Sequence, residues 1–241
     1  MKNLFLLILL GLSTPLMAGA NLGNLHCIGD SLTDGAGCSP GEGGYRHPLD
    51  RALTAASIGH TFVGTLNTWP NLSWIPGMHD GHGGWSTTDL TYGKNGEGCA
   101  PQWVASFQPQ TVILMTGRND SWDWFYSGSG WHDPYSTLVN LIYASDPNVT
   151  IYWCNPFMPR DWNYWEDQRC QAQDTALKQV ISEQRTIGRK IFYVDTYHRL
   201  QGVPSDYSDA IHLNDSGYQK LERVIFLVIL KTNPSSVNPF R

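Results

Sequence analysis

Short apolar runs alternate with segments of helical periodicity along most of this chain, and this alternation limits the folds that it can adopt. The clearest run, residues 111–115, is continuously apolar, as expected for a strand that is covered on both faces. Further strands are predicted at 25–28, 61–64, 149–153 and 190–194. Strands that alternate with helices form parallel sheets, so the sequence predicts an α/β fold with helices on both faces of one sheet.

The segments between these strands carry the helical pattern. Leu49, Leu53 and Ala56 recur at helical spacing, for example. Helices are predicted at 45–57, 87–92, 101–107, 134–145, 171–187 and 216–231. The glycine-rich and proline-rich stretches 31–40 and 65–85, and the segment 155–165, are expected to be loops.

The first 20 residues have the order of a secretory signal peptide. Lys2 precedes an apolar run at 4–12, and Ala18, Gly19 and Ala20 offer a cleavage site. The run is too short to span a bilayer comfortably, although an uncleaved anchor is the alternative. We therefore expect a secreted or periplasmic protein without stable membrane association after cleavage. Residues 21–232 are predicted to form one domain, and 233–241 a C-terminal tail.

Charge and cysteine content narrow the function classes. A net charge of −5 without any basic run argues against nucleic acid as a partner. The five cysteines lack the Cys-x-x-Cys spacing of zinc sites. An oxidising compartment permits two disulfides, and the predicted pairs are Cys38–Cys99 and Cys154–Cys170, with Cys27 free in its buried strand. Five free thiols are the alternative.

Three polar residues follow predicted strands. Ser31 follows the strand 25–28, Asn119 follows the strand 111–115, and His212 lies in the loop after the strand 190–194. Because the carboxyl ends of parallel strands share one edge of a sheet, these side chains can meet there. Asp209 lies three residues before His212, close enough for its carboxylate to contact the imidazole.

Hydrolysis by serine needs a base and a carboxylate that fixes the tautomer of the base. The predicted triad is Ser31, His212 and Asp209. Its order in the chain is that of α/β-hydrolases, but the Gly-x-Ser-x-Gly elbow is absent, which implies a different fold. The backbone N–H of Ser31, a backbone N–H in the turn 82–85 and the side-chain amide of Asn119 are the predicted oxyanion donors.

Together these motifs resemble the SGNH (GDSL-type) hydrolase family. The family's first block matches Gly29-Asp30-Ser31-Leu32, and its second glycine matches Gly84 best, with the neighbouring Gly83 as the alternative. Its third block matches 117–120, and its fifth matches 209–212. The resemblance spans residues 25–230. It implies a flavodoxin-like three-layer α/β/α sandwich with about five parallel strands, and an ester hydrolase without a cofactor. Asp30 and Asp120 within these blocks are expected to be structural.

A narrower resemblance is to the third carbohydrate esterase family. It rests on Gly43-Gly44-Tyr45-Arg46, on Phe62-Val63-Gly64 and on His82-Gly83-Gly84-Trp85. Members of that family remove acetyl groups from xylan-type polysaccharides, so the resemblance implies such a substrate. Two features depart from the family pattern: Leu213 stands in place of a proline, and the loop 122–131 is longer and more aromatic.

Two aromatic loops are predicted to border the site. Trp122 and Trp124 follow the third block, and Trp162 and Trp165 follow the next strand. Flat rings suit the apolar faces of sugars, and we predict that these tryptophans and Arg118 contact substrate. The rings also suit an acyl chain or loop packing, and a solvated position at the rim is the alternative for Arg118.

His79, Asp80 and His82 lie close together but lack a further ligand at a known spacing, so no metal site is predicted. The predicted function is a secreted serine esterase that hydrolyses acetyl or other short acyl esters on polysaccharides. The alternatives are a lipid-directed esterase or lysophospholipase of the same fold, and a non-catalytic carbohydrate-binding protein. No oligomeric state follows from the sequence.

Overall fold

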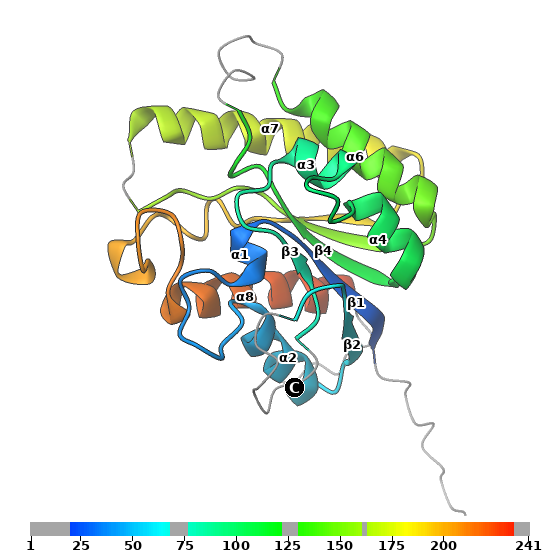
Figure 1. The fold of residues 1–241 in the computed structure, drawn as a ribbon, viewed down its shortest axis with the longest axis horizontal. Helices are drawn as coiled ribbons and strands as arrows, with labels where there is room; N and C mark the ends of the chain where they lie inside the picture. Colours follow the sequence, from blue (N-terminus) through cyan, green and yellow to red (C-terminus); the bar gives the residue numbers. More distant parts are fainter. Residues whose placement is uncertain (1–19, 68–76, 122–129, 161–162, 234–241) are drawn as a thin grey trace, which may run out of the picture.

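A computed structural model describes residues 20–67, 77–121, 130–160 and 163–233 of the chain (Figure 1). The predicted signal peptide, apart from Ala20, and the predicted tail after Asn233 lie outside the described residues. Within the described part, no helix has both the length and the apolar character needed to cross a bilayer.

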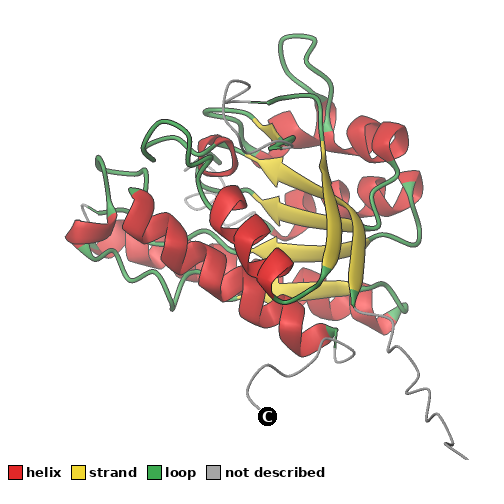
Figure 2. Ribbon diagram, turned by 90° about the horizontal axis from the view of Figure 1, so that it is seen from below, coloured by secondary structure: helices red, strands yellow, loops and turns green. Residues whose placement is uncertain are grey.

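The sheet of the described residues consists of six parallel strands, and the arrowheads of its inner strands point the same way in Figure 2. They are β1 (Asn21–Gly29), β2 (Gly59–Val63), β3 (Asp80–Gly81), β4 (Thr111–Met115), β5 (Thr150–Cys154) and β6 (Ile191–Val194). Five of them lie in the order β2-β1-β4-β5-β6, which is the flavodoxin-like order, and the short β3 pairs with the end of β1. The predicted fold class is therefore confirmed, with one short strand added.

Helices cover both faces of the sheet, which gives the three layers that Figure 1 shows. One face carries α2 (Arg46–Ala55) and α8 (Asp215–Thr232), and the other carries α3 (Thr87–Tyr92), α4 (Ala100–Phe107), α6 (His132–Ser145) and α7 (Tyr164–Thr186). Two short elements, α1 (Ser31–Asp34) and the 3₁₀ helix η1 (Pro204–Asp206), lie in the loops where the strands end.

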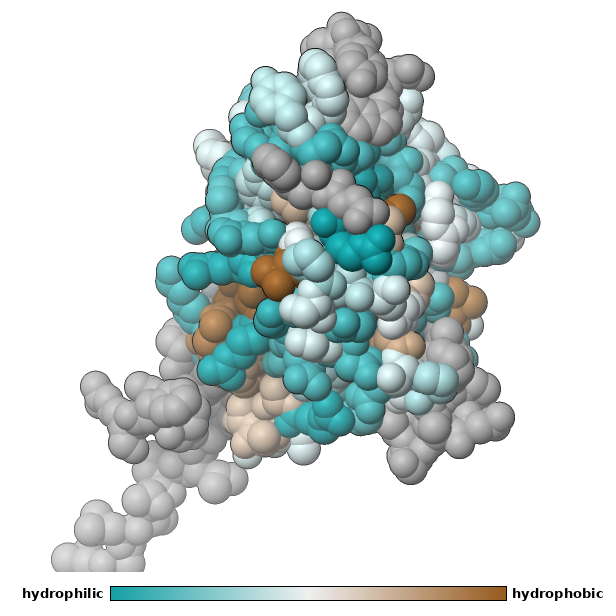
Figure 3. All heavy atoms as spheres, turned by 90° about the vertical axis from the view of Figure 1, so that its left-hand side faces the viewer, coloured by the Kyte–Doolittle hydropathy of each residue, from teal (hydrophilic) through white to brown (hydrophobic). Residues whose placement is uncertain are grey.

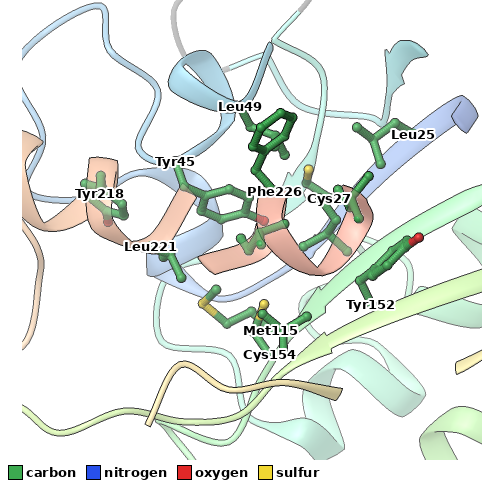
Figure 4. Packing of buried hydrophobic residues seen from close by; sticks show 14 of the residues in the cluster. Leu25, Cys27, Tyr45, Leu49, Met115, Tyr152, Cys154, Tyr218, Leu221 and Phe226 are labelled. Atoms are coloured by element: carbon green, nitrogen blue, oxygen red, sulfur yellow. The ribbon is translucent and has the colours of Figure 1, made fainter. Parts of the chain in front are cut away.

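Apolar side chains alternate between the two faces of the sheet. On β4, Ile113 and Met115 belong to the cluster that faces α2 and α8, whereas Val112 and Leu114 belong to the cluster on the other face. Figure 4 shows the first cluster, in which residues of β1 and β4 meet side chains of α2 and α8. This burial on both faces explains why the run 111–115 is continuously apolar.

The predicted disulfides are wrong, because all five cysteines are free. Cys154 packs in the cluster under α2 and α8, whereas Cys170 lies on α7, on the opposite face of the sheet. Cys38 likewise packs against the first cluster, while Cys99 is the N-cap of α4 on the other face. Cys27 is free in its buried strand, as predicted.

Among the elements that differ from the sequence predictions are α7, α1 and β3. Helix α7 begins seven residues before the predicted 171, because the Asn163 side chain accepts a hydrogen bond from the Glu166 amide at 3.0 Å and caps the helix there. The predicted loop 31–40 begins with a turn of helix, α1. The predicted loop 65–85 contains β3.

Candidate active site

Ser31 is the first residue of α1, directly after the central strand β1. The chain turns there because the Asp30 side chain accepts a hydrogen bond from the Leu32 amide at 2.9 Å and caps the helix. Gly29 has no room for a side chain, since a Cβ would lie 2.3 Å from Thr33 Oγ1 and 2.4 Å from the Met115 carbonyl oxygen. This tight turn holds Ser31 at the edge where the strands end.

The structure brings the three predicted triad residues together. His212 Nε2 lies 3.0 Å from Ser31 Oγ, and His212 Nδ1 lies 2.7 Å from Asp209 Oδ2. A carboxylate can only accept, so Nδ1 carries the proton and the lone pair of Nε2 faces the hydroxyl of Ser31. This is the arrangement that a serine nucleophile and its general base require.

Asp209 is held as a carboxylate by its own loop. Its Oδ1 accepts hydrogen bonds from the amides of Ile211 and His212, both at 2.7 Å. Partial burial raises the pKa of Asp209, but the hydrogen bonds from His212 and Ile211 outweigh it and lower the pKa to about 2. The group is therefore ionised at neutral pH.

The loop that carries Asp209 and His212 is anchored by backbone hydrogen bonds and by a buried side chain. Tyr207 and Leu213 form a backbone bridge, and the Ser208 amide donates to the His212 carbonyl at 2.9 Å. Leu213, which stands where the resembled family has proline, is fully buried in the cluster under α8. This departure from the family pattern therefore supplies an apolar anchor to the loop.

Asn119 lies beside the turn that carries Gly84. Its Nδ2 donates to the Trp85 carbonyl at 3.0 Å, and the second contact, to Asp30 Oδ2, is long at 3.4 Å. One amide hydrogen is thus left weakly bonded. Gly84 is exposed with a φ of +74°, and an added Cβ would meet nothing within 4 Å. No hydrogen bond to the amides of Ser31 or Gly84 is found in the described part of the chain.

Contacts of the buried His82 and Asp80 side chains hold the turn 82–85 in place. His82 stacks on Trp85 and on Trp103, with ring centroids 4.2 Å and 4.9 Å away, and its amide donates to the Gly29 carbonyl at 2.9 Å. Asp80, before it, accepts from buried His26 Nε2 at 2.6 Å. Across the described residues, no group of three or more His, Cys, Asp or Glu side chains is arranged to hold a metal ion. The contact between His26 and Asp80 was not predicted from the sequence.

Asp30 and Asp120 have structural partners. Asp120 accepts from the Thr87 amide at 2.7 Å and from its hydroxyl at 3.0 Å, which ties the start of α3 to the loop after β4. Burial raises the pKa of each of these two carboxyl groups to about 6, although the hydrogen bonds to them oppose this shift.

Arg118 is not a solvated rim residue, since its side chain is only 11% exposed. Its Nη2 donates to Glu166 Oε2 at 2.8 Å, while Nη1 has no hydrogen-bond partner among the described residues. Trp122, Trp124 and Trp162 lie outside the described residues. Trp165 is 57% exposed in the first turn of α7. Contact of these residues with substrate stays a prediction.

A second Asp-x-x-His segment went unnoticed in the sequence. Asp195 and His198 follow β6, and His198 Nδ1 lies 2.8 Å from Asp195 Oδ1. Its local geometry is close to that of Asp209 and His212. Of these two histidines, only His212 is within hydrogen-bond distance of Ser31 Oγ, so spacing alone does not identify the candidate base.

Comparison with known proteins agrees with this geometry. The sequence model of the GDSL-like Lipase/Acylhydrolase family matches residues 27–220. A family 3 carbohydrate esterase from Clostridium thermocellum superposes with a TM-score of 0.72 at 24% identity, over 89% of this chain and 98% of that one. A comparison with curated proteins finds no match.

Two further solved structures share the fold. A carbohydrate esterase of family 3 from Talaromyces cellulolyticus superposes with a TM-score of 0.66 at 22% identity, over 89% of this chain and 98% of that one. An acetylxylan esterase from Geobacillus stearothermophilus gives a TM-score of 0.61 at 22% identity, over 88% of this chain and 95% of that one.

Proposed function

This chain belongs to the GDSL-like lipase/acylhydrolase family of carboxylic ester hydrolases, and we propose that it is a secreted serine esterase that removes acetyl groups from a polysaccharide. The observation that carries the proposal is the 3.0 Å contact between Ser31 Oγ and His212 Nε2, with Asp209 behind the imidazole. The signal-like pattern of residues 1–20 supports secretion.

The reaction follows from the geometry of the triad. Ser31 Oγ attacks the ester carbonyl while His212 Nε2 takes its proton, and Asp209 stabilises the imidazolium that forms. The Ser31 and Gly84 amides and the Asn119 side chain donate hydrogen bonds to the oxyanion. His212 then gives the proton from Ser31 to the sugar oxygen as the ester C–O bond breaks, so that the sugar leaves as a free hydroxyl. Water, deprotonated by the same imidazole, hydrolyses the acyl-enzyme and releases acetate.

Three observations support a polysaccharide ester over a lipid ester. The solved structures described above include two family 3 carbohydrate esterases and an acetylxylan esterase. The described part of the face in Figure 3 is mainly hydrophilic, with a few apolar areas. Tyr164 and Trp165 are 61% and 57% exposed on α7, where flat rings can stack on sugar rings. An acyl chain would need a continuous apolar groove instead.

The test measures acetate release from acetylated xylan and the hydrolysis of p-nitrophenyl acetate and octanoate. We expect acetate release from xylan and a higher kcat/KM for the acetate ester than for the octanoate ester. The matched control, Ser31→Ala, should lower kcat by on the order of 10⁴ or more. A preference for octanoate would favour the lipid-directed alternative. Xylan binding without labelling of Ser31 by a fluorophosphonate would favour the non-catalytic alternative.

A further inference from the structure

A cavity separate from the triad lies at the same edge of the sheet. It has a volume of about 580 Å³ and opens between the loops that follow β5 and β6 and the first turns of α7. Its lining residues are Met158, Asp167, Gln171, Tyr197, His198 and Gln201. None of these residues takes part in the chemistry described above.

The segment that follows β5 forms a wall between the cavity and the loop that carries Asp209 and His212. The carbonyl of Met158, which lines the cavity, accepts a hydrogen bond from the hydroxyl of Tyr207, and the Arg160 amide donates to the Ala210 carbonyl at 3.0 Å. In the sheet, β5 and β6 lie two and three strands away from β1, which carries Ser31. With strands about 4.8 Å apart, this separation is on the order of 10–15 Å. One molecule that occupies both sites must therefore be long, and a saccharide of that length is an oligomer.

The lining offers neutral hydrogen-bonding groups around one carboxylate. Asp167 accepts from the hydroxyl of Tyr197 through Oδ1 and from Gln171 Nε2 at 2.8 Å through Oδ2, so it holds both side chains in place. Amides and a hydroxyl match the hydroxyl groups of a sugar, which both donate and accept. None of the described lining residues is Lys or Arg, and the charge of Asp167 disfavours an anionic sugar.

Hydrogen bonds and ring contacts hold the side of the cavity that Tyr197 and His198 form. Buried Asn155, at the end of β5, accepts hydrogen bonds from the amides of Thr196 at 2.8 Å and Tyr197 at 3.0 Å. The Tyr197 and His198 rings meet edge to face with centroids 4.7 Å apart. Side chains that are already held in place lose little conformational entropy when a ligand binds.

An exposed aromatic side chain stands on the same helix as part of the lining. Tyr164 precedes Asp167 by three residues and Gln171 by seven, so the three share one face of α7. Tyr164 is 61% exposed and meets Trp165 edge to face at 5.3 Å. Core packing therefore does not account for this ring.

We propose that this cavity is a remote subsite for an unsubstituted, neutral sugar unit of the polysaccharide whose acetyl ester reacts at Ser31. The inference rests on the proposed function, because it assigns the place where the rest of that substrate binds. Tyr164 and Tyr197 contact the faces of the sugar ring, and Gln171 and Gln201 bind its hydroxyl groups. The subsite selects oligosaccharides over monosaccharides.

The test compares kcat/KM for acetylated xylo-oligosaccharides of increasing length with that for p-nitrophenyl acetate. In the wild type, kcat/KM should rise with oligosaccharide length. Gln171→Ala and Tyr164→Ala should each lower the ratio of the oligosaccharide value to the p-nitrophenyl value by roughly three- to tenfold, through KM. The matched control is Tyr92→Ala, which removes a 69% exposed tyrosine from α3 and should leave the ratio unchanged.

A binding measurement separates the subsite from the proposed function. Calorimetry on Ser31→Ala should show binding of an unsubstituted xylo-oligosaccharide that Gln171→Ala weakens by a similar factor. If acetylated oligosaccharides are cleaved but neither variant moves the ratio or the binding, the subsite is wrong and the function stands. If binding depends on Gln171 but no acetylated glycan is cleaved, the function is wrong and the subsite stands. A preference for glucuronate-bearing chains would overturn its neutral character.

Discussion

Replacing Asp209 with asparagine separates two roles of this carboxylate. Oδ1 accepts the amides of Ile211 and His212, and the carbonyl oxygen of an asparagine can accept them as well, so the loop should keep its shape. Oδ2 accepts from His212 Nδ1 at 2.7 Å, and an asparagine NH₂ group at that position can only donate. The imidazole would then carry its proton on Nε2, which faces Ser31, and the base would be lost.

The expected effect is large on catalysis and small on stability. A wrong tautomer lowers kcat by about 10⁴ in the serine hydrolases where it has been isolated, and such a loss corresponds to about 5.5 kcal/mol in the activation barrier. Asp209 has a side chain that is 55% exposed and would retain its two backbone contacts, so the Tm should change little. The assay is kcat for p-nitrophenyl acetate, with Tm measured on the same samples.

Asp195→Asn is the matched control, because Asp195 bonds to His198 with the same spacing and a similar distance of 2.8 Å. We expect this variant to keep the wild-type kcat for p-nitrophenyl acetate. A fall of less than about tenfold in Asp209→Asn, with the fold intact, would refute the tautomer argument. Equal losses in both variants would show that the contact with Ser31 does not identify the base.

Three further outcomes are expected. Asn119→Ala should lower kcat by roughly 10²–10³ if its amide binds the oxyanion, and an unchanged rate would remove Asn119 from the hole. Burial raises the pKa of Asp120 to about 6, so the folded chain keeps a proton that the unfolded chain releases between about pH 4 and 6. The free energy of unfolding, measured with urea and compared with that of Asp120→Asn, should therefore fall by on the order of 3 kcal/mol as the pH rises through this interval. A difference that does not change with pH would contradict the raised pKa of Asp120. Because the five cysteines are free, dithiothreitol should leave the Tm unchanged, and a lower Tm would point to a disulfide.

Local sequence patterns predicted correctly the bounds of elements that carry a complete pattern of their own, such as a continuous apolar run or a capped helix. The bounds of β4 and α3 agree with the sequence prediction, since a continuously apolar run and a capped helical segment are determined by their own residues. Helix α7 was predicted too short, although Asn163 followed three residues later by Glu166 is a capping signal that the sequence contains. The prediction assigned this segment to a loop and did not use the cap.

Other features depend on contacts between distant parts of the chain. Strand β3 has no strand-like pattern, and it forms where Gly81 allows α1 to approach, since a Cβ would lie 2.3 Å from the Asp34 amide nitrogen. The cysteine pairing failed for a different reason. The alternation along β5 places Cys154 with Tyr152 on one face of the sheet. Cys170 lies on α7, which covers the other face, so the two thiols cannot meet.

The position of the candidate base follows from the strand order. Strand β6 lies three strands from β1, so a histidine directly after β6, such as His198, stays far from Ser31. The chain must first return across the edge of the sheet to α8, which packs with α2 on the face beside β1, and His212 lies just before α8 begins. The chain bonds to the loop after β5 through Tyr207, just before the second Asp-x-x-His segment, and through Ala210 within it. The same crossing that brings His212 to Ser31 therefore also builds the wall between the predicted triad and the remote cavity. Under the proposed function, an oligomeric substrate would have to pass over this wall to occupy both sites.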